Sequence, residues 1–166
     1  MSAEIDTGDT GDDGRERIAR DAPTVSAITM ISAPVEKVWR VVVAFDQYAQ
    51  WHPVLSLDAM PEQVVVGAEV PARISGVDSA DRLVTMTIVD VDAPRRLVWE
   101  GGSLDAILGR HSFVLTPEPD GTTKFTESEE FLGSGAAEVV PTLGKLSKEY
   151  ARYGAALRAR VDGSSD

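Results

Sequence analysis

Six stretches with the composition of β-strands follow one another between residues 54 and 131, and this succession constrains the fold more than any other feature of the chain. Clusters of Pro, Gly, Asp and Ser separate them, as expected where a chain reverses direction. Consecutive strands joined by short turns pair antiparallel. The sequence therefore predicts an antiparallel meander that contains the segments 54–60, 68–77, 82–92, 95–101, 106–116 and 122–131.

Patterns before the meander predict one more strand and two short helices. Residues 24–31 alternate and are rich in β-forming side chains, which is typical of a strand. In 32–45 the residues Val35, Val38, Trp39 and Val42 recur at helical spacing. Residues 47–51 continue as a second short helix, which must end near His52 because Pro53 disfavours helical geometry in the residue before it.

The end of the chain returns to helical spacing. Residues 136–161 predict one long amphipathic helix, and Pro141 marks its start or a kink near its start. The apolar stripe of this helix contains Leu143, Leu146, Tyr150, Leu157 and Val161. We therefore expect an α+β fold in which a curved seven-stranded antiparallel sheet wraps around the C-terminal helix. Such a sheet cannot fill all the space beneath it, so a cavity is expected between sheet and helix.

Length and composition indicate one globular domain with short flanking segments. The chain has 166 residues, 43% of them hydrophobic and 26% charged. Residues 1–22 hold seven acidic and three basic residues and almost no large apolar side chains, so we expect a disordered acidic leader. The domain is expected at 23–161, with 162–166 as a flexible tail.

Charge and residue usage exclude several kinds of partner. A net charge of −11 argues against nucleic acid and anionic membrane surfaces, which are bound through clustered Lys and Arg. The chain has no cysteine and two histidines far apart, so we expect no metal site and no cofactor. Its longest strongly apolar run, 41–45, is too short to span a membrane. We expect a cytoplasmic monomer or homodimer whose partner is a small hydrophobic molecule.

Three segments resemble the SRPBCC superfamily, the START and birch-pollen-allergen-like group, and within it the polyketide cyclase/dehydrase branch. They are ISAPVEKVWRVVVAFDQYAQWHP, VDAPRRLVWEG and GRHSFVLTPEPDGTTKFTESEEFLG, followed by the amphipathic tail, and together they span about 24–161. The resemblance implies the helix-grip fold and a deep hydrophobic cavity for polyketide, aromatic, isoprenoid or lipid-like molecules. Some members use that cavity for transport and others for catalysis.

The strands 106–116 and 122–131 carry polar residues on a face that is otherwise aromatic. If PEPDG forms the loop, His111 lies opposite Glu127, and Glu129 is its diagonal neighbour. A tight turn at Asp120-Gly121 would instead place His111 opposite Glu130 and break the aromatic match. A histidine held by a carboxylate in an apolar cavity can act as a general acid or base, so we predict catalytic roles for His111, Glu127 and Glu129.

Other side chains complete the predicted site. Tyr150, on the helix stripe, could donate a hydrogen bond to a carbonyl or enolate oxygen. The alternative for each of these groups is structural: a satisfied buried pair, solvated carboxylates, or core packing of the aromatic rings. Predicted ligand contacts are Trp99, Phe113, Phe125, Phe131, Trp51, Tyr48, Leu146 and Arg73.

Three functions fit these features. The first is binding of a small hydrophobic ligand in an internal cavity. The second is a cofactor-free cyclase or dehydratase of natural-product biosynthesis that uses a His/Glu acid–base pair. The third is a protein-binding adaptor of the same fold, which an exposed apolar patch outside the cavity would favour.

Overall fold

A single antiparallel sheet of seven strands dominates the computed structural model, which describes residues 22–76 and 80–164. The strand order is β1-β7-β6-β5-β4-β3-β2, so the predicted meander is present and β1 closes it beside β7. The predicted leader therefore lies outside the described residues except for Ala22, as do the last two residues of the predicted tail. The strands are β1 (Thr24–Ile31), β2 (Leu55–Leu57), β3 (Glu69–Ile74), β4 (Arg82–Asp92), β5 (Arg96–Gly102), β6 (Leu108–Pro117) and β7 (Thr123–Leu132).

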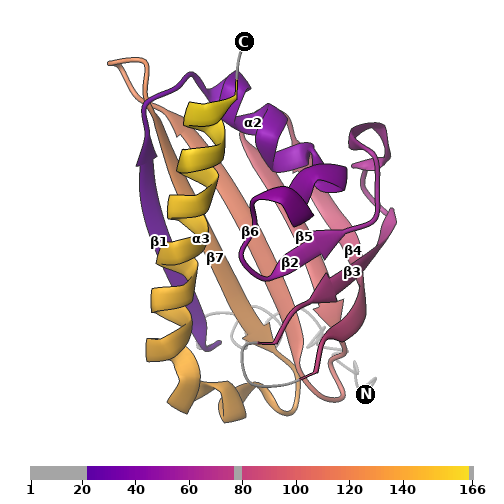
Figure 1. Ribbon diagram of the computed structural model, residues 1–166. Coiled ribbons are helices and arrows are strands. Elements are labelled where there is room, and N and C mark those ends of the chain that lie inside the picture. The colour runs from indigo at the N-terminus through magenta and orange to yellow at the C-terminus, as the bar shows by residue number, and fades with distance from the viewer. Residues whose placement is uncertain (1–21, 77–79, 165–166) are drawn as a thin grey trace, which may run out of the picture.

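The helices cover one face of the sheet, as Figure 1 shows. Helix α3 (Leu143–Gly163) lies along β1 and β7, while α2 (Val35–Val43) and the 3₁₀ helix η1 (Phe45–Gln50) cover the side of β2 to β6. A further 3₁₀ turn, η2 (Pro61–Gln63), follows β2. This is the predicted α+β helix-grip arrangement, with two short helices after the first strand and a long helix at the C-terminus.

The predicted C-terminal helix is divided into two parts. Residues Ala136–Thr142 form a 3₁₀ helix, η3, which contains Pro141, and the α-helix begins at Leu143. Proline has no backbone N–H and its ring excludes the residue before it from α-helical geometry, so the regular helix starts after it. At the other end of α3, the Arg160 guanidinium donates hydrogen bonds of 2.8 and 3.0 Å to the side-chain oxygens of Gln47 and Gln50, which ties α3 to η1.

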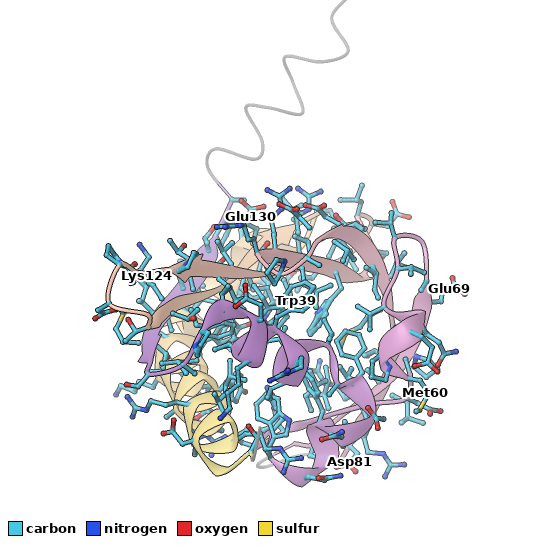
Figure 2. The ribbon with its side chains drawn as sticks, turned by 90° about the horizontal axis from the view of Figure 1, so that it is seen from above. Trp39, Met60, Glu69, Asp81, Lys124 and Glu130 are labelled. Carbon is cyan, nitrogen blue, oxygen red and sulfur yellow. The ribbon has the colours of Figure 1, made fainter. Side chains whose placement is uncertain are left out.

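Two groups of apolar side chains fill the space between the sheet and the helices (Figure 2). The larger group joins α2, η1, the inner face of β2 to β7 and the second half of α3, where Leu157 and Val161 are buried. The smaller group lies under the first half of α3 and centres on Val25, Phe131 and Tyr150. The protein interior is therefore packed along the whole length of α3.

The β6–β7 hairpin has the predicted inner face but a different register. His111 lies opposite Glu129 and Phe113 opposite Glu127, so the predicted pairing of His111 with Glu127 as direct neighbours is wrong by two residues. The reason is the loop: the strands end at Pro117 and Thr123, and Glu118 N–H donates to the Thr122 carbonyl across the turn. A shift of two residues leaves every side chain on its predicted face.

Helix α3 passes close to β1 at Gly154. A Cβ atom at this position would lie 2.0 Å from the Thr29 hydroxyl oxygen and 3.1 Å from Thr29 Cβ. Both atoms belong to a short, buried, β-branched side chain that cannot move far. Glycine at 154 is therefore what allows α3 to rest on β1.

We predict that Gly154→Ala destabilises the protein although alanine is the better helix former. The expected loss is about 1–3 kcal/mol in the free energy of unfolding, from overpacking against Thr29, measured by urea denaturation. Gly144→Ala is the matched control, because a Cβ there meets no described atom within 4 Å, and it should be neutral or stabilising by up to about 1 kcal/mol. Adding Thr29→Ala to the Gly154→Ala variant should restore much of the lost stability. Equal stability of the two glycine variants would contradict this account.

Candidate functional site

The centre of the candidate site is a buried histidine paired with a buried carboxylate. His111 on β6 and Glu127 on β7 lie on the inner face, and His111 Nε2 is 2.9 Å from Glu127 Oε1. The two residues are diagonal neighbours, a separation that long side chains can bridge. Glu127 is 2% exposed and the His111 side chain 13% exposed. The predicted His111–Glu127 contact is therefore present, although in the other register.

A second carboxylate and a tyrosine extend the pair into a chain of hydrogen bonds. The Tyr150 hydroxyl on α3 donates to Glu129 Oε2, and its oxygen lies 3.4 Å from His111 Nδ1. Space for Glu129 exists because residue 109 is glycine: a Cβ atom there would lie 2.1 Å from Glu129 Oε1. Four predicted catalytic side chains thus meet in the order Glu129, Tyr150, His111, Glu127.

The directions of these bonds determine the protonation of His111. Burial, followed by the charge of Glu129, raises the pKa of Tyr150, so its hydroxyl keeps its proton and donates it to Glu129. The Tyr150 oxygen can then only accept from His111 Nδ1, while Nε2 faces an acceptor, Glu127. Both ring nitrogens therefore face groups that can accept a hydrogen bond, and this arrangement favours the imidazolium form of His111.

The electrostatic environment of His111 agrees with this assignment. Burial lowers its pKa, but the hydrogen bond and charge of Glu127, together with the charge of Glu129, outweigh burial and raise the pKa above the ordinary value of 6.5. An imidazolium ring at this position can release a proton to a ligand, and a neighbouring carboxylate can take one up.

Aromatic rings surround His111. Its ring centroid lies 4.7 Å from that of Phe113 and 5.3 Å from that of Tyr150, both in stacked arrangements, and 5.2 Å from that of Trp99. Phe113 stacks in turn on Phe125 at 5.8 Å. Three of the predicted ligand contacts, Trp99, Phe113 and Phe125, are therefore packed around the polar chain and form its apolar wall.

A small cavity adjoins this chain on the side of η1 and α3. Its volume is about 10 Å³, close to the space that one water molecule needs. Its lining includes Glu127 and Trp51, and the indole Nε1 of Trp51 is buried without a hydrogen-bond partner among the described residues. The lining residues are Val42, Tyr48, Trp51, His52, Phe113, Phe125, Glu127, Tyr153 and Leu157. The expected gap between sheet and helix is thus nearly filled by side chains.

His52 belongs to this cavity and was not among the predicted site residues. Its Nδ1 accepts hydrogen bonds from the backbone N–H groups of Val54 at 3.3 Å and Leu55 at 3.0 Å. Burial, followed by the nearby His111, lowers its pKa to about 3, so the ring is neutral and its hydrogen is on Nε2. The only sequence signal at His52 is the His-Pro step after the short helix. This step indicates a turn, but it does not indicate that the turn lies beside the cavity in the folded protein.

The remaining predicted contacts lie in several places. Tyr48 lines the cavity, but its hydroxyl donates to the Val42 carbonyl at 2.7 Å and is not free for a ligand. Phe131 and Leu146 pack in the smaller apolar group beneath the first half of α3, next to Tyr150. Arg73 is on the other face of the sheet, exposed, with Asp81 at 3.6 Å, and so it does not reach the His111 group.

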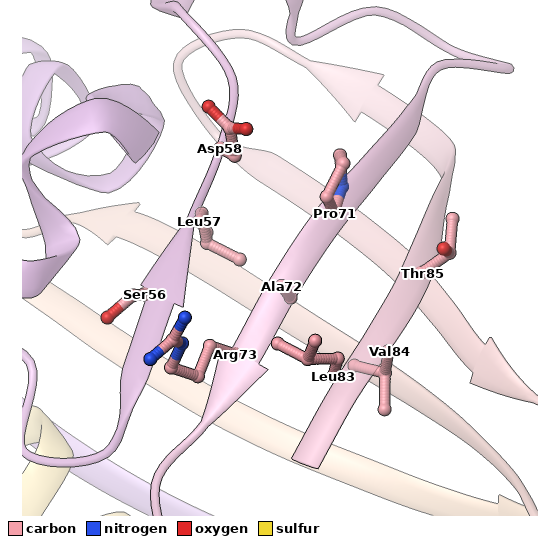
Figure 3. Close-up of a pocket in the computed structure, with 9 residues that line it drawn as sticks. All are labelled: Ser56, Leu57, Asp58, Pro71, Ala72, Arg73, Leu83, Val84 and Thr85. Carbon is pink, nitrogen blue, oxygen red and sulfur yellow. The ribbon is translucent and has the colours of Figure 1, made fainter. Parts of the chain in front are cut away.

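Arg73 instead borders a hollow on the outer face of β2, β3 and β4, drawn in Figure 3. This hollow has a volume of about 440 Å³ and lies over Ala72, with the Arg73 side chain extending toward β2. It is larger than the inner cavity, but its rim is exposed and the side chains that alternate onto this face include Ser56, Asp58, Pro71, Leu83 and Thr85. We place the candidate site at the inner cavity because the coupled titratable groups are there.

Within residues 22–76 and 80–164, no group of three or more His, Cys, Asp or Glu side chains is arranged to hold a metal ion. Nor does this part contain a helix that combines the length and the apolar character needed to cross a membrane.

Several solved structures share the fold of this protein. DynU16, a protein in the dynemicin biosynthetic locus, is 20% identical, with 84% of this chain and 47% of DynU16 covered and a TM-score of 0.64. BexL, a di-domain ARO/CYC from the BE-7585A biosynthetic pathway, is 15% identical, with 92% and 55% covered and a TM-score of 0.67. The chain therefore spans about half the length of these two proteins.

A third structure has a similar length. It is a START superfamily protein from Mycobacterium smegmatis, 15% identical, with 84% of this chain and 97% of that protein covered and a TM-score of 0.63. At such identities the likeness shows the fold alone, which is the helix-grip arrangement. No curated protein matched the chain. Residues 22–161 match the family described as polyketide cyclase / dehydrase and lipid transport, and the chain belongs to that family.

The two histidines should titrate on opposite sides of pH 6.5. The pKa of His111 is raised, so its stabilising contribution is complete below its unfolded value of about 6.5 and is lost as pH rises through the folded pKa. The pKa of His52 is lowered to about 3, so its contribution is complete above about 6.5 and is lost as pH falls toward 3. NMR titration of the two imidazole rings, each assigned with a His→Gln variant, should resolve both.

Glu127→Gln should lower the pKa of His111, because it removes a charge and weakens the charge-assisted hydrogen bond that raises it. Glu130→Gln is the control: Glu130 is on the same strand but faces outward, 3.8 Å from Arg110, and its loss should leave His111 unchanged. A His111 pKa at or below 6.5 in the wild-type protein would contradict the imidazolium assignment.

Proposed function

We propose that the protein binds a small hydrophobic ligand beside the His111–Glu127 pair. The observation that carries this proposal is the chain from Glu129 to Glu127, because it places ionised groups inside an aromatic interior next to a cavity. Buried charges cost folding free energy even when they are paired, and a fold that needed only stability would do as well with apolar side chains. The family description, polyketide cyclase / dehydrase and lipid transport, supports a hydrophobic ligand.

Ligand binding requires the inner cavity to widen. Sites for small organic ligands have volumes of about 300–1,000 Å³, far above the volume of about 10 Å³ seen here. Three lining residues, Trp51, His52 and Tyr153, are only half-buried and stand between the cavity and solvent. We propose that a ligand enters by displacing the Tyr153 ring on α3.

Removing the Tyr153 ring should improve access. We expect Tyr153→Ala to bind the neutral fluorescent probe N-phenyl-1-naphthylamine about threefold more tightly or better, since less energy is spent on displacing a side chain. Leu83→Ala, in the outer hollow, should leave the affinity unchanged. Loss of binding in Leu83→Ala with no change in Tyr153→Ala would place the ligand on the outer face and contradict the proposal. The measurement is a fluorescence titration.

A second function, dehydration of a β-hydroxy ketone, is favoured by the imidazolium assignment of His111. In this reaction the Glu127 carboxylate removes a proton from the carbon next to the ketone. The bond from the β-carbon to its hydroxyl breaks, and the imidazolium of His111 gives that oxygen a proton, so water leaves and a C=C bond forms. Glu127 is then protonated and His111 neutral, and one proton transfer across their 2.9 Å contact restores both.

The dehydration proposal predicts separate effects on turnover and binding. With 4-hydroxy-4-phenylbutan-2-one as substrate, formation of the conjugated enone can be followed by ultraviolet absorbance. Replacing either partner, in His111→Gln or Glu127→Gln, should lower kcat by about a hundredfold or more while the affinity for the product enone changes by no more than a few-fold. Glu130→Gln should leave both unchanged. Equal loss of turnover and affinity, or loss of neither, would contradict a catalytic role and leave ligand binding as the function.

A further inference from the structure

The indole nitrogen of Trp51 is a buried hydrogen-bond donor that the protein itself does not use. Among the described residues it is the buried side-chain nitrogen or oxygen for which no partner is found. An unpaired buried donor costs about 1–3 kcal/mol, so protein interiors seldom contain one. Trp51 also lines the inner cavity, as Glu127 does. A group that enters the cavity therefore comes next to a residue whose N–H has no partner in the protein.

His52 provides a second donor next to Trp51. Two backbone N–H groups, of Val54 and Leu55, occupy its Nδ1, so the hydrogen of the neutral ring is on Nε2. The backbone is fixed at both residues, because the N–H groups of Trp51 and His52 donate to the Tyr48 carbonyl at 3.1 and 2.8 Å. The His52 ring also stacks on Tyr48 at a centroid distance of 5.8 Å. Trp51 and His52 are thus neighbouring donors at the end of η1.

Tyr150 cannot fill this role without breaking an existing bond. Its hydroxyl proton is donated to Glu129, so the hydroxyl has no hydrogen left for a ligand oxygen. A ligand carbonyl in the cavity would therefore find its donor at Trp51, which lines the cavity together with Glu127.

We propose that Trp51 Nε1–H, supported by His52, binds the carbonyl oxygen of the ligand, and that the ligands selected are neutral ketones. This inference rests on the proposed ligand-binding function. The charges explain the selection: the residues that line the cavity include the carboxylate of Glu127 but no Lys or Arg, so an anionic group would be repelled. In the dehydration reaction the same donors would stabilise the negative charge that develops on the carbonyl oxygen when the adjacent proton is removed.

Three probes of similar shape test this inference. They are 2-acetylnaphthalene, which carries a ketone; 2-isopropenylnaphthalene, its hydrocarbon counterpart; and 2-naphthoate, its carboxylate counterpart. One neutral hydrogen bond corresponds to about a fivefold to tenfold change in affinity. Trp51→Phe should weaken binding of the ketone by that factor and binding of the hydrocarbon by less than about twofold. Trp39→Phe is the matched control, because Trp39 is on α2 and is not among the residues that line the cavity, and it should change neither affinity.

The wild-type protein supplies an independent readout if a variant folds poorly. Its three tryptophans give three indole N–H signals in a proton–nitrogen spectrum, and the signal of Trp51 should shift downfield with the ketone and not with the hydrocarbon. If Trp51→Phe weakens binding of the ketone and of the hydrocarbon equally, the proposed role of the N–H is wrong. It is also wrong if the Trp51 signal does not shift with the ketone. In both cases ligand binding itself would remain supported. Tighter binding of the carboxylate probe than of the ketone probe would overturn the proposed selection of neutral ketones. If none of the three probes binds the wild-type protein, the proposed function fails as well.

Discussion

The close contact between α3 and β1 determines where the site can form. Gly154 rests against Thr29, and this contact sets both the distance and the rotation of α3 relative to the sheet. Tyr150 is four residues earlier on the helix and therefore lies on the same face, where its hydroxyl reaches Glu129 and approaches His111. Leu157 and Val161 continue that face into the main core. A larger side chain at 154 would move the helix that carries one of the four polar groups.

Electrostatic balance is the second condition for the site. The interior around His111 consists of aromatic rings, and such a medium opposes an isolated charge. The charge of His111 persists because Glu127 and Glu129 face its two sides, directly and through Tyr150. His52 is near enough for the charge of His111 to act on it, yet it has no carboxylate partner and stays neutral. One buried histidine is thus prepared to release a proton and the other to offer a hydrogen bond.

Family membership and site geometry answer different questions about this protein. The match over residues 22–161 places the chain among polyketide cyclase / dehydrase and lipid transport proteins, and the solved structures share its fold at 15–20% identity. The fold supplies a curved sheet, a helix and an interior between them. The fold is shared with other proteins, whereas the polar groups in the interior are those of this chain. These groups decide whether a protein with this fold can perform acid–base chemistry on a ligand or can only carry it.

Much of the fold could be predicted from local patterns, because alternation and helical spacing record which face of an element is buried. They placed His111, Glu127 and Glu129 on the inner face of the hairpin and Tyr150 on the inner stripe of the helix. Alternation has a period of two, so it could not separate the observed register from one shifted by two residues; the extent of the loop decided that. Arg73 alternates onto the outer face of β3, which the prediction of a ligand contact did not take into account.

What the sequence determined by itself is therefore the order of the elements and the residues that face inward, since both follow from local spacing and turn chemistry. The tertiary structure decided which of those residues meet. The direction of the hydrogen-bond chain, the small volume of the cavity, and the position of Trp51 and His52 beside Glu127 all depend on segments far apart in the chain. These distances arise only when the helix packs on the curved sheet, and no periodicity within a single segment contains them.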